Sequence, residues 1–460
     1  MKKVFLITMV GLLLVSMVFS FSLIGCKTAA VSETTAAAQT SSAGAETTAA
    51  AETTATAASG EKPNLIFWQN EAGSGLTQWY KDVIADINAN EDFTVEMIEN
   101  LGGGTEVITK LVTAGVSQSG FDISWDWSGT MSTLARGVAG TYQPVNKLVS
   151  SDVLNKLSKD TQTANTDADG NLWGVPFFLE TAFMAYNKNL LEKAGVDTAN
   201  LPTSFDDFMA MNKKLKDAGI IPISFANKEG LVHEFWIMDM IQQYFNTAEE
   251  HKSFWTDAKF IDNANLKDCM EKYKKMYDEK YLDPEGETLD YASNYFSRFS
   301  SGKVAGVWFI NSMYISAVKE SELGSENVIY QKLPFFGSGT LKDAIPTLGY
   351  CLTISNWTKY PEQCAKAIEY FTSEKWQTEM ALKYGVTPAY TEVDVSSATD
   401  LTPNMKFIFE SGKGKYTEMG YVDWVAGQYD ELIRSATSYL HGDITYEEFA
   451  KNMEASSVIE

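Results

Sequence analysis

One carboxylate of this chain stands in unusual surroundings. Glu180 follows a predicted strand over residues 172–176, which Pro176 ends, and it interrupts an apolar and aromatic run over residues 177–186. A buried carboxylate is costly unless another group binds it. That group could be a lysine or backbone amides, in which case Glu180 is structural, or it could be a bound ligand.

Further polar and aromatic side chains stand where predicted strands end. Residues 64–68, 93–98 and 121–125 are runs typical of strands, and helical spacing over residues 76–87 and 105–114 places a helix after each of the first two. Such alternation predicts an α/β lobe with a mainly parallel sheet, in which ligands bind at the carboxyl ends of the strands. Those ends carry Trp68, Asn70, Glu71, Asp126 and Trp127.

These residue types suit a sugar. The C–H faces of a pyranose pack on aromatic rings, and its hydroxyl edges pair with carboxylates and side-chain amides. Rings are offered by Trp68, Trp127, Trp236 and Trp308. Carboxylates and amides are offered by Asn70, Glu71, Asp126, Glu180 and Asn311. Core packing is the alternative for each tryptophan, and it is weakest for Trp127, which lies in a polar loop.

No catalytic or metal-binding signature accompanies these residues. The chain has neither H-E-x-x-H nor G-x-S-x-G. His233, one of three histidines, has no metal-like partner nearby, and we expect it to form hydrogen bonds at the surface or in a cleft. A glycoside hydrolase would use two carboxylates about a sugar's reach apart, a part that Asp126 and Glu180 could play. The chain lacks eight βα repeats, however, so we predict no enzyme, no cofactor and no metal site.

The amino-terminal end has the form of a bacterial lipoprotein signal. Met1-Lys2-Lys3 is basic, residues 4–24 are almost wholly apolar, and Leu23-Ile24-Gly25-Cys26 looks like a lipobox. Cleavage would remove residues 1–25 and leave an acylated Cys26 that anchors the protein to a membrane. An uncleaved transmembrane helix is the alternative. Residues 26–62, the cysteine and a tract rich in Ala, Thr, Ser and Glu, are expected to form a disordered tether.

The remaining body, residues 63–460, is long enough for two lobes. The chain carries a formal charge of −23, and removal of Lys2 and Lys3 brings it to −25. This charge disfavours nucleic acid and anionic membrane surfaces as partners. The body has three cysteines and no C-x-x-C motif. Of these, Cys351 and Cys364 could pair, but buried thiols are favoured.

Several segments resemble one family in both order and spacing. Residues 170–176 read G-N-L-W-G-V-P, Glu180 follows four residues later, and residues 186–195 read Y-N-K-N-L-L-E-K-A-G. They resemble the family 1 extracellular solute-binding proteins of sugar ABC importers, the maltose-binding-protein-like group. Residues 296–313 resemble a further segment of that family, although Gly306 replaces its usual methionine and Asn311-Ser312-Met313 stands where an Asn or Gly followed by Trp is common.

The resemblance implies a type II periplasmic-binding-protein-like fold, with two α/β lobes and a ligand cleft between them. Glu180 would lie at the hinge and bind ligand, and Tyr350 would line the cleft. Each lobe would be discontinuous. The N-terminal lobe would comprise residues 63–178 and 337–386, and the C-terminal lobe residues 179–336 and 387–460.

By the same resemblance, the protein would be the substrate-binding lipoprotein of an ABC importer. It would capture a mono- or oligosaccharide between lobes that close because the closed form binds ligand more tightly, and deliver it to a permease and its ATPase. It would act as a monomer outside the cytoplasm, held at the cell envelope by its lipid anchor. A secreted glycoside hydrolase and a binding lipoprotein for a non-sugar solute, such as a peptide or polyamine, are the alternatives.

Overall fold

The computed structural model of the chain describes residues 62–69, 75–99, 104–393, 406–407, 416–418, 424 and 427–457. These residues belong to one compact unit, Glu61–Glu460. The predicted signal peptide, Cys26, nearly all of the tether, Asn70 and Glu71 lie outside the described residues. Within the described part, no helix is both long and apolar enough to span a membrane.

The first sheet begins with the predicted alternation of strands and helices. β1 (Asn64–Trp68) lies between β2 (Thr94–Ile98) and β3 (Ile123–Trp127) and is parallel to both. The crossovers are α2 (Thr77–Asn90) and α3 (Gly104–Ser117). Parallel strands joined by helices are the arrangement of an α/β lobe, so this part of the fold prediction is confirmed.

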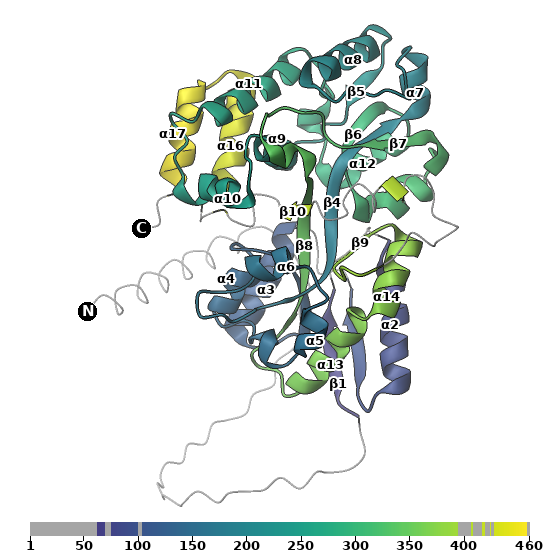
Figure 1. Cartoon of the computed structure of the whole chain (residues 1–460), viewed down its shortest axis with the longest axis vertical. Coiled ribbons are helices and arrows are strands. Elements are labelled where there is room, and N and C mark those ends of the chain that lie inside the picture. Colours follow the sequence, from purple (N-terminus) through teal and green to yellow (C-terminus); the bar gives the residue numbers. More distant parts are fainter. Residues whose placement is uncertain are drawn as a thin grey trace, which may run out of the picture. The chain divides into compact units, whose positions relative to one another are not determined.

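Two long strands join this sheet to a second one. β4 (Val175–Asn187) and β8 (Ile345–Ile354) run antiparallel, side by side, through the middle of the body (Figure 1). Residues 175–181 of β4 pair with β8, whereas residues 182–187 pair with β6 (Val304–Ile310) and β7 (Val328–Gln331). β6 also pairs with β5 (Ile221–Ile223). β4 therefore changes sheets directly after Thr181, the residue that follows Glu180.

The predicted end of a strand at Pro176 is wrong. β4 begins at Val175, runs through Pro176 and continues along the aromatic run to Asn187. Proline is tolerated because it is the second residue of the strand and lies at an irregularity in the pairing with β8, between Pro176 and Phe178. All 13 residues of β4 are buried, so the aromatic run is a core strand shared by both sheets.

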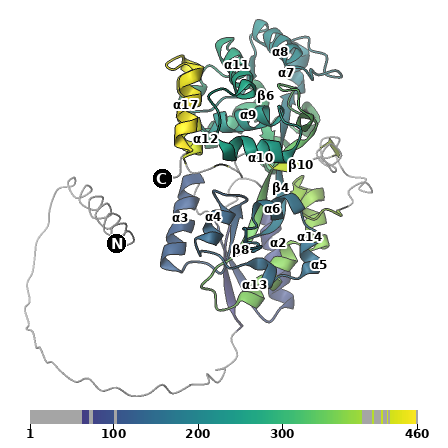
Figure 2. The same ribbon diagram turned by 60° about the vertical axis from the view of Figure 1, so that its left-hand side comes forward.

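Helices cover both sheets (Figure 2). The side chain of Ser204 accepts a hydrogen bond at the start of α8 (Phe205–Asp217), and Thr445 and Glu448 form a capping box at the start of α17 (Tyr446–Ser456). Further elements are α4 (Thr133–Val138), α5 (Ser151–Leu154), α6 (Lys159–Ala164), α7 (Lys188–Lys193), α9 (Leu231–Gln242), α10 (Ala248–Asp257), α11 (Ala264–Asp278), α12 (Tyr291–Ser300), α13 (Pro361–Phe371), α14 (Glu374–Glu379), α16 (Gln428–His441), β9 (Thr387–Pro388) and β10 (Tyr416–Glu418).

The cysteines of the body are free thiols in the core. Cys269, Cys351 and Cys364 are all buried, and no disulfide joins Cys351 to Cys364. Cys351 belongs to β8, whereas Cys364 belongs to α13. The prediction of buried thiols is confirmed.

Candidate functional site

The Glu180 carboxylate is buried and has neutral partners. Its side chain is 6 % exposed, Oε2 accepts a hydrogen bond from the Tyr350 hydroxyl at 2.6 Å, and Oε1 accepts one from the Ser312 hydroxyl. Burial raises the pKa of Glu180, and the two hydroxyl donors oppose that rise. Within the described part of the chain, no lysine or arginine forms an ion pair with this carboxylate. The lysine or backbone-amide partner considered from the sequence is therefore replaced by two hydroxyls.

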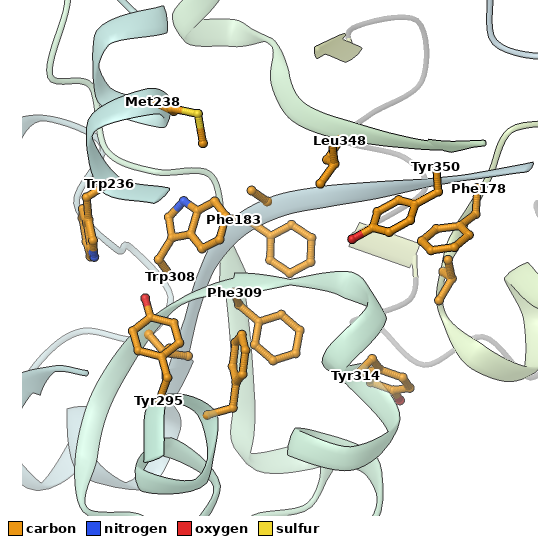
Figure 3. Close-up of a cluster of buried hydrophobic side chains, with 14 of the residues drawn as sticks. Phe178, Phe183, Trp236, Met238, Tyr295, Trp308, Phe309, Tyr314, Leu348 and Tyr350 are labelled. Atoms are coloured by element: carbon orange, nitrogen blue, oxygen red, sulfur yellow. The ribbon is translucent and has the colours of Figure 1, made fainter. Parts of the chain in front are cut away.

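Strand register places Tyr350 beside Glu180. Phe178 lies opposite Tyr350 and Glu180 opposite Leu348 in the β4–β8 pair. Because alternate residues of a strand point to the same face, all four side chains share one face of the sheet. The Tyr350 ring stacks on Phe178, with ring centroids 4.3 Å apart and planes 13° from parallel (Figure 3). This stack fixes the ring, so the hydroxyl is held in position for Glu180.

The Asn311 side chain binds the backbone of β4 at the place where this strand changes sheets. Its side chain is fully buried, and Oδ1 accepts a hydrogen bond from the Thr181 backbone amide at 3.1 Å. Its Nδ2 donates to the Thr387 hydroxyl at 3.0 Å and to the Leu179 carbonyl at 3.4 Å. These bonds orient the neighbouring Ser312 toward Glu180. We call Phe178, Glu180, Asn311, Ser312 and Tyr350 the hinge cluster.

Trp127 and Trp68 are both partly buried, and both pack against one small apolar cluster. Trp127 is partly buried, lies opposite Tyr350 in the β3–β8 pair, and contacts the edge of Trp125 with centroids 4.7 Å apart. Trp68 packs on Phe121, with centroids 5.0 Å apart, in a small apolar cluster on the α3 side of the sheet. Trp127 therefore lies next to the hinge cluster as well as this apolar cluster, whereas Trp68 packs on Phe121 within the apolar cluster.

Asp126 forms a buried ion pair with Arg136. The side chain is fully buried, Oδ2 accepts hydrogen bonds from Arg136 Nε at 2.6 Å and from the Tyr142 hydroxyl at 2.7 Å, and Oδ1 accepts from Arg136 Nη2. The Trp127 backbone amide also donates to Oδ1, at 2.9 Å. Both carboxylate oxygens are therefore occupied within the protein.

His233 and Trp236 are buried on α9. His233 contacts Asn227, Tyr273 and Thr437 through its two ring nitrogens at 2.9–3.0 Å, and burial lowers its pKa to about 3, so the ring is neutral at pH 7. Trp236 is fully buried and lies parallel to Tyr273, with centroids 6.5 Å apart. Both side chains have structural partners in this conformation.

Trp308 is buried in the second sheet. It is 1 % exposed, and its indole Nε1 donates to Asp239 at 2.9 Å. Figure 3 shows it between Trp236 and Phe183.

Of the predicted site residues, Glu180, Asn311 and Tyr350 are brought together and Trp127 lies beside them. The sequence prediction missed Ser312, which directly follows Asn311, and Phe178, which lies two residues before Glu180.

Comparison with known proteins places the chain in a family. Residues 73–378, more than half of the chain, match the bacterial extracellular solute-binding proteins. The structure resembles a chitin oligosaccharide binding protein with a TM-score of 0.73 and 19 % identity, covering 86 % of this chain and 98 % of that one. It resembles the sugar-binding protein MalE from Xanthomonas citri with a TM-score of 0.64 and 16 % identity, covering 86 % and 96 % of the two chains.

A curated relative matches over a shorter stretch. The sn-glycerol-3-phosphate-binding periplasmic protein of Agrobacterium fabrum (strain C58 / ATCC 33970) is 27 % identical over 167 residues, which is 34 % of this chain. The chain spans about a third of the length of that relative (35 %). The match over residues 73–378 and the two-lobed α/β fold shared with MalE together show that this chain belongs to the bacterial extracellular solute-binding proteins.

Proposed function

We propose that the protein captures a mono- or oligosaccharide between its two lobes and delivers it to the permease and ATPase of an ABC importer. The observation that carries the proposal is the hinge cluster. Among the residues that the structure describes, the hydrogen-bond partners of the buried Glu180 carboxylate are two hydroxyls, and Glu180 lies where β4 passes from one sheet to the other. A ligand hydroxyl that donates to this carboxylate would form a charge-assisted hydrogen bond.

The surroundings of Glu180 suit a sugar better than an anionic solute. The Trp127 ring is partly exposed and can pack on the C–H face of a pyranose, while Glu180 and Tyr350 can pair with its hydroxyls. A phosphate group would face the Glu180 charge, and phosphate sites commonly use arginine. The three arginines of this chain are already paired with acids: Arg136 with Asp126, Arg298 with Asp283, and Arg434 with Glu431.

The same geometry disfavours the glycoside hydrolase alternative. That chemistry needs two carboxylates with free oxygens facing one sugar. Asp126, the proposed partner of Glu180, has both oxygens bound by Arg136, Tyr142 and the Trp127 amide. The ligand residues of this proposal are therefore Glu180, Tyr350 and Trp127, with Asn70 and Glu71 as further candidates.

We expect the purified protein to bind a sugar at micromolar concentration or below, about −8 kcal/mol or better, and to leave it unchanged. A thermal-shift screen over neutral mono- and oligosaccharides finds the ligand, because a ligand at 100 times its Kd adds about 2.7 kcal/mol to the free energy of unfolding. Chromatography after long incubation checks for turnover. Hydrolysis of more than one equivalent of sugar would show that the protein is a glycoside hydrolase and would refute the binding proposal.

We further propose that Cys26 is lipidated after removal of residues 1–25 and that residues 26–62 tether the monomer outside the cytoplasm. The lipobox-like residues 23–26 support this, as does membership of an extracellular family. The Cys26→Ala variant is expected to lose incorporation of a fatty-acid probe and to accumulate as precursor, as measured by metabolic labelling and gel mobility. Equal labelling of variant and wild type would refute the anchor.

A further inference from the structure

The loop after β1 touches the second lobe through a glycine. Gly75 lies between β1 and α2 of the first sheet, with a φ of +81°. Ile315 begins the helical turn Ile315–Lys319, which follows β6 of the second sheet. A methyl group added at Gly75 would lie 2.7 Å from Ile315 Cβ and 2.9 Å from its Cγ2, closer than unbonded carbons pack. The backbone of this loop therefore abuts a side chain of the other lobe, with no room for one more carbon.

A hydrogen bond makes a second contact of this kind. Thr130, which lies shortly after β3, donates from its hydroxyl to the Trp424 carbonyl at 2.8 Å. Its loop is held in place, because the Gly129 amide donates to Asn165 Oδ1 at 2.9 Å. On the other side, Trp424 is 2 % exposed and packs on Trp255 of α10, with ring centroids 5.4 Å apart. The bond thus joins a fixed loop of the first sheet to a firmly packed residue.

The helices around Trp424 belong to the lobe of the second sheet. The Trp424 ring lies against Tyr429 of α16, with ring centroids 5.5 Å apart. Thr437 of α16 in turn contacts His233 of α9, the helix that follows β5, at 3.0 Å. The Thr130–Trp424 bond, like the Gly75–Ile315 contact, therefore connects the two lobes.

Both contacts lie away from the strand that passes between the sheets. Neighbouring strands follow the order β2-β1-β3-β8-β4, and Gly75 and Thr130 come after the carboxyl ends of β1 and β3. The chain changes sheets in β4, directly after Thr181. When two rigid bodies turn about a hinge, groups at the hinge stay together and groups away from it separate. Opening of the lobes about β4 would therefore break both contacts.

We propose that Gly75–Ile315 and Thr130–Trp424 are closure contacts, which set the equilibrium between open and closed lobes without touching the ligand. This inference rests on the proposed capture of a ligand between the lobes and adds what regulates its affinity. A ligand that needs the closed form binds with an apparent Kd equal to its intrinsic Kd divided by the closed fraction of the free protein. Weakening a closure contact therefore lowers the affinity for every ligand by one factor, whereas loss of a ligand-binding side chain gives a factor that depends on the sugar.

A pair of glycine substitutions tests the steric contact. Gly75→Ala places a methyl group against Ile315. Gly140→Ala is the matched control, because Gly140 also has a positive φ, +86°, but none of the described atoms lies within 4 Å of an added methyl group. Isothermal titration calorimetry of the full chain uses glucose, galactose, xylose and cellobiose. For every sugar that binds, Gly75→Ala should weaken binding by the same factor, about fivefold or more, and Gly140→Ala by less than about twofold. Adding Ile315→Ala to Gly75→Ala should restore most of the affinity.

Variants of Thr130 test the hydrogen bond with the same four sugars. Thr130→Val keeps the shape of the side chain but removes the donor, and it should weaken binding of every sugar by one factor of about two- to tenfold, the range of one hydrogen bond. Thr130→Ser keeps the hydroxyl and should stay near wild type. A loss that differs by more than about threefold from sugar to sugar would show that these residues contact the ligand, and the inference would be wrong.

Small-angle X-ray scattering of the ligand-free variants supplies a readout that needs no sugar. Gly75→Ala and Thr130→Val are expected to raise the radius of gyration above that of wild type and of Gly140→Ala, because both shift the free protein toward its open form. Radii and affinities that equal those of Gly140→Ala overturn the inference and leave the proposed function standing. Raised radii without binding to any sugar of the panel or of the thermal-shift screen support the closure contacts and refute capture of a sugar. Unchanged radii without any binding overturn both.

Discussion

Replacing Arg136 with methionine is expected to lower the free energy of unfolding by about 3–5 kcal/mol. The substitution leaves the fully buried Asp126 carboxylate without its cation, and only the Tyr142 hydroxyl and one backbone amide remain to compensate its charge. An uncompensated buried charge costs far more than the pair itself contributes. Urea denaturation followed by tryptophan fluorescence measures the loss.

A surface pair supplies the control. Arg434 is also paired with an acid, Glu431, through Nε at 3.0 Å, but its side chain is 61 % exposed. Arg434→Met should therefore cost no more than about 1 kcal/mol. Adding Asp126→Leu to Arg136→Met should recover stability, because the unpaired charge is then removed. Equal losses for the two arginine variants would contradict the assignment of Asp126 to a buried structural pair.

The sequence predicts the first sheet well because its signals are local. β1, β2 and β3 are short apolar runs separated by helices of clear period, and each lies within two residues of its predicted place. β4 is different, since a fully buried strand has no alternation of polar and apolar residues to show its extent. The sequence therefore predicts that this strand ends at Pro176, although an irregularity in the pairing with β8 accommodates the proline.

The candidate site is only partly predictable, because an aromatic residue in a core and one in a cleft look alike in sequence. Trp236 and Trp308 are buried. The partly exposed ring that stacks on Trp308 is Phe235, and no sequence pattern distinguishes Phe235 from a core residue. Asp126 stands at the end of a strand like a ligand residue, but Arg136 reaches it from α4. The scarcity of arginine was the available signal, because each of the three arginines is paired with an acid.

In the described part of the chain, Glu180 has no cation partner, whereas Asp126 is paired with Arg136. We therefore expect the second large effect at Glu180, on ligand affinity. Glu180→Gln keeps the shape of the side chain but removes its charge, so a sugar hydroxyl loses a charge-assisted bond worth about 1.5–3 kcal/mol. Affinity for the sugar should fall about ten- to a hundredfold. The ligand-free protein should melt at the same or a higher temperature, because burial raises the pKa of Glu180 and the folded state therefore disfavours its charge.

The pH dependence of binding provides an independent test of this role. Protonation replaces an acceptor oxygen with a donor, so the affinity of the wild type should fall as the pH falls through the raised pKa of Glu180, and the Gln variant should lack this component. Circular dichroism of the ligand-free Gln variant and of the wild type is the control for fold. A purely structural Glu180 gives the opposite pattern: the ligand-free Gln variant melts earlier while its sugar affinity and pH profile match the wild type.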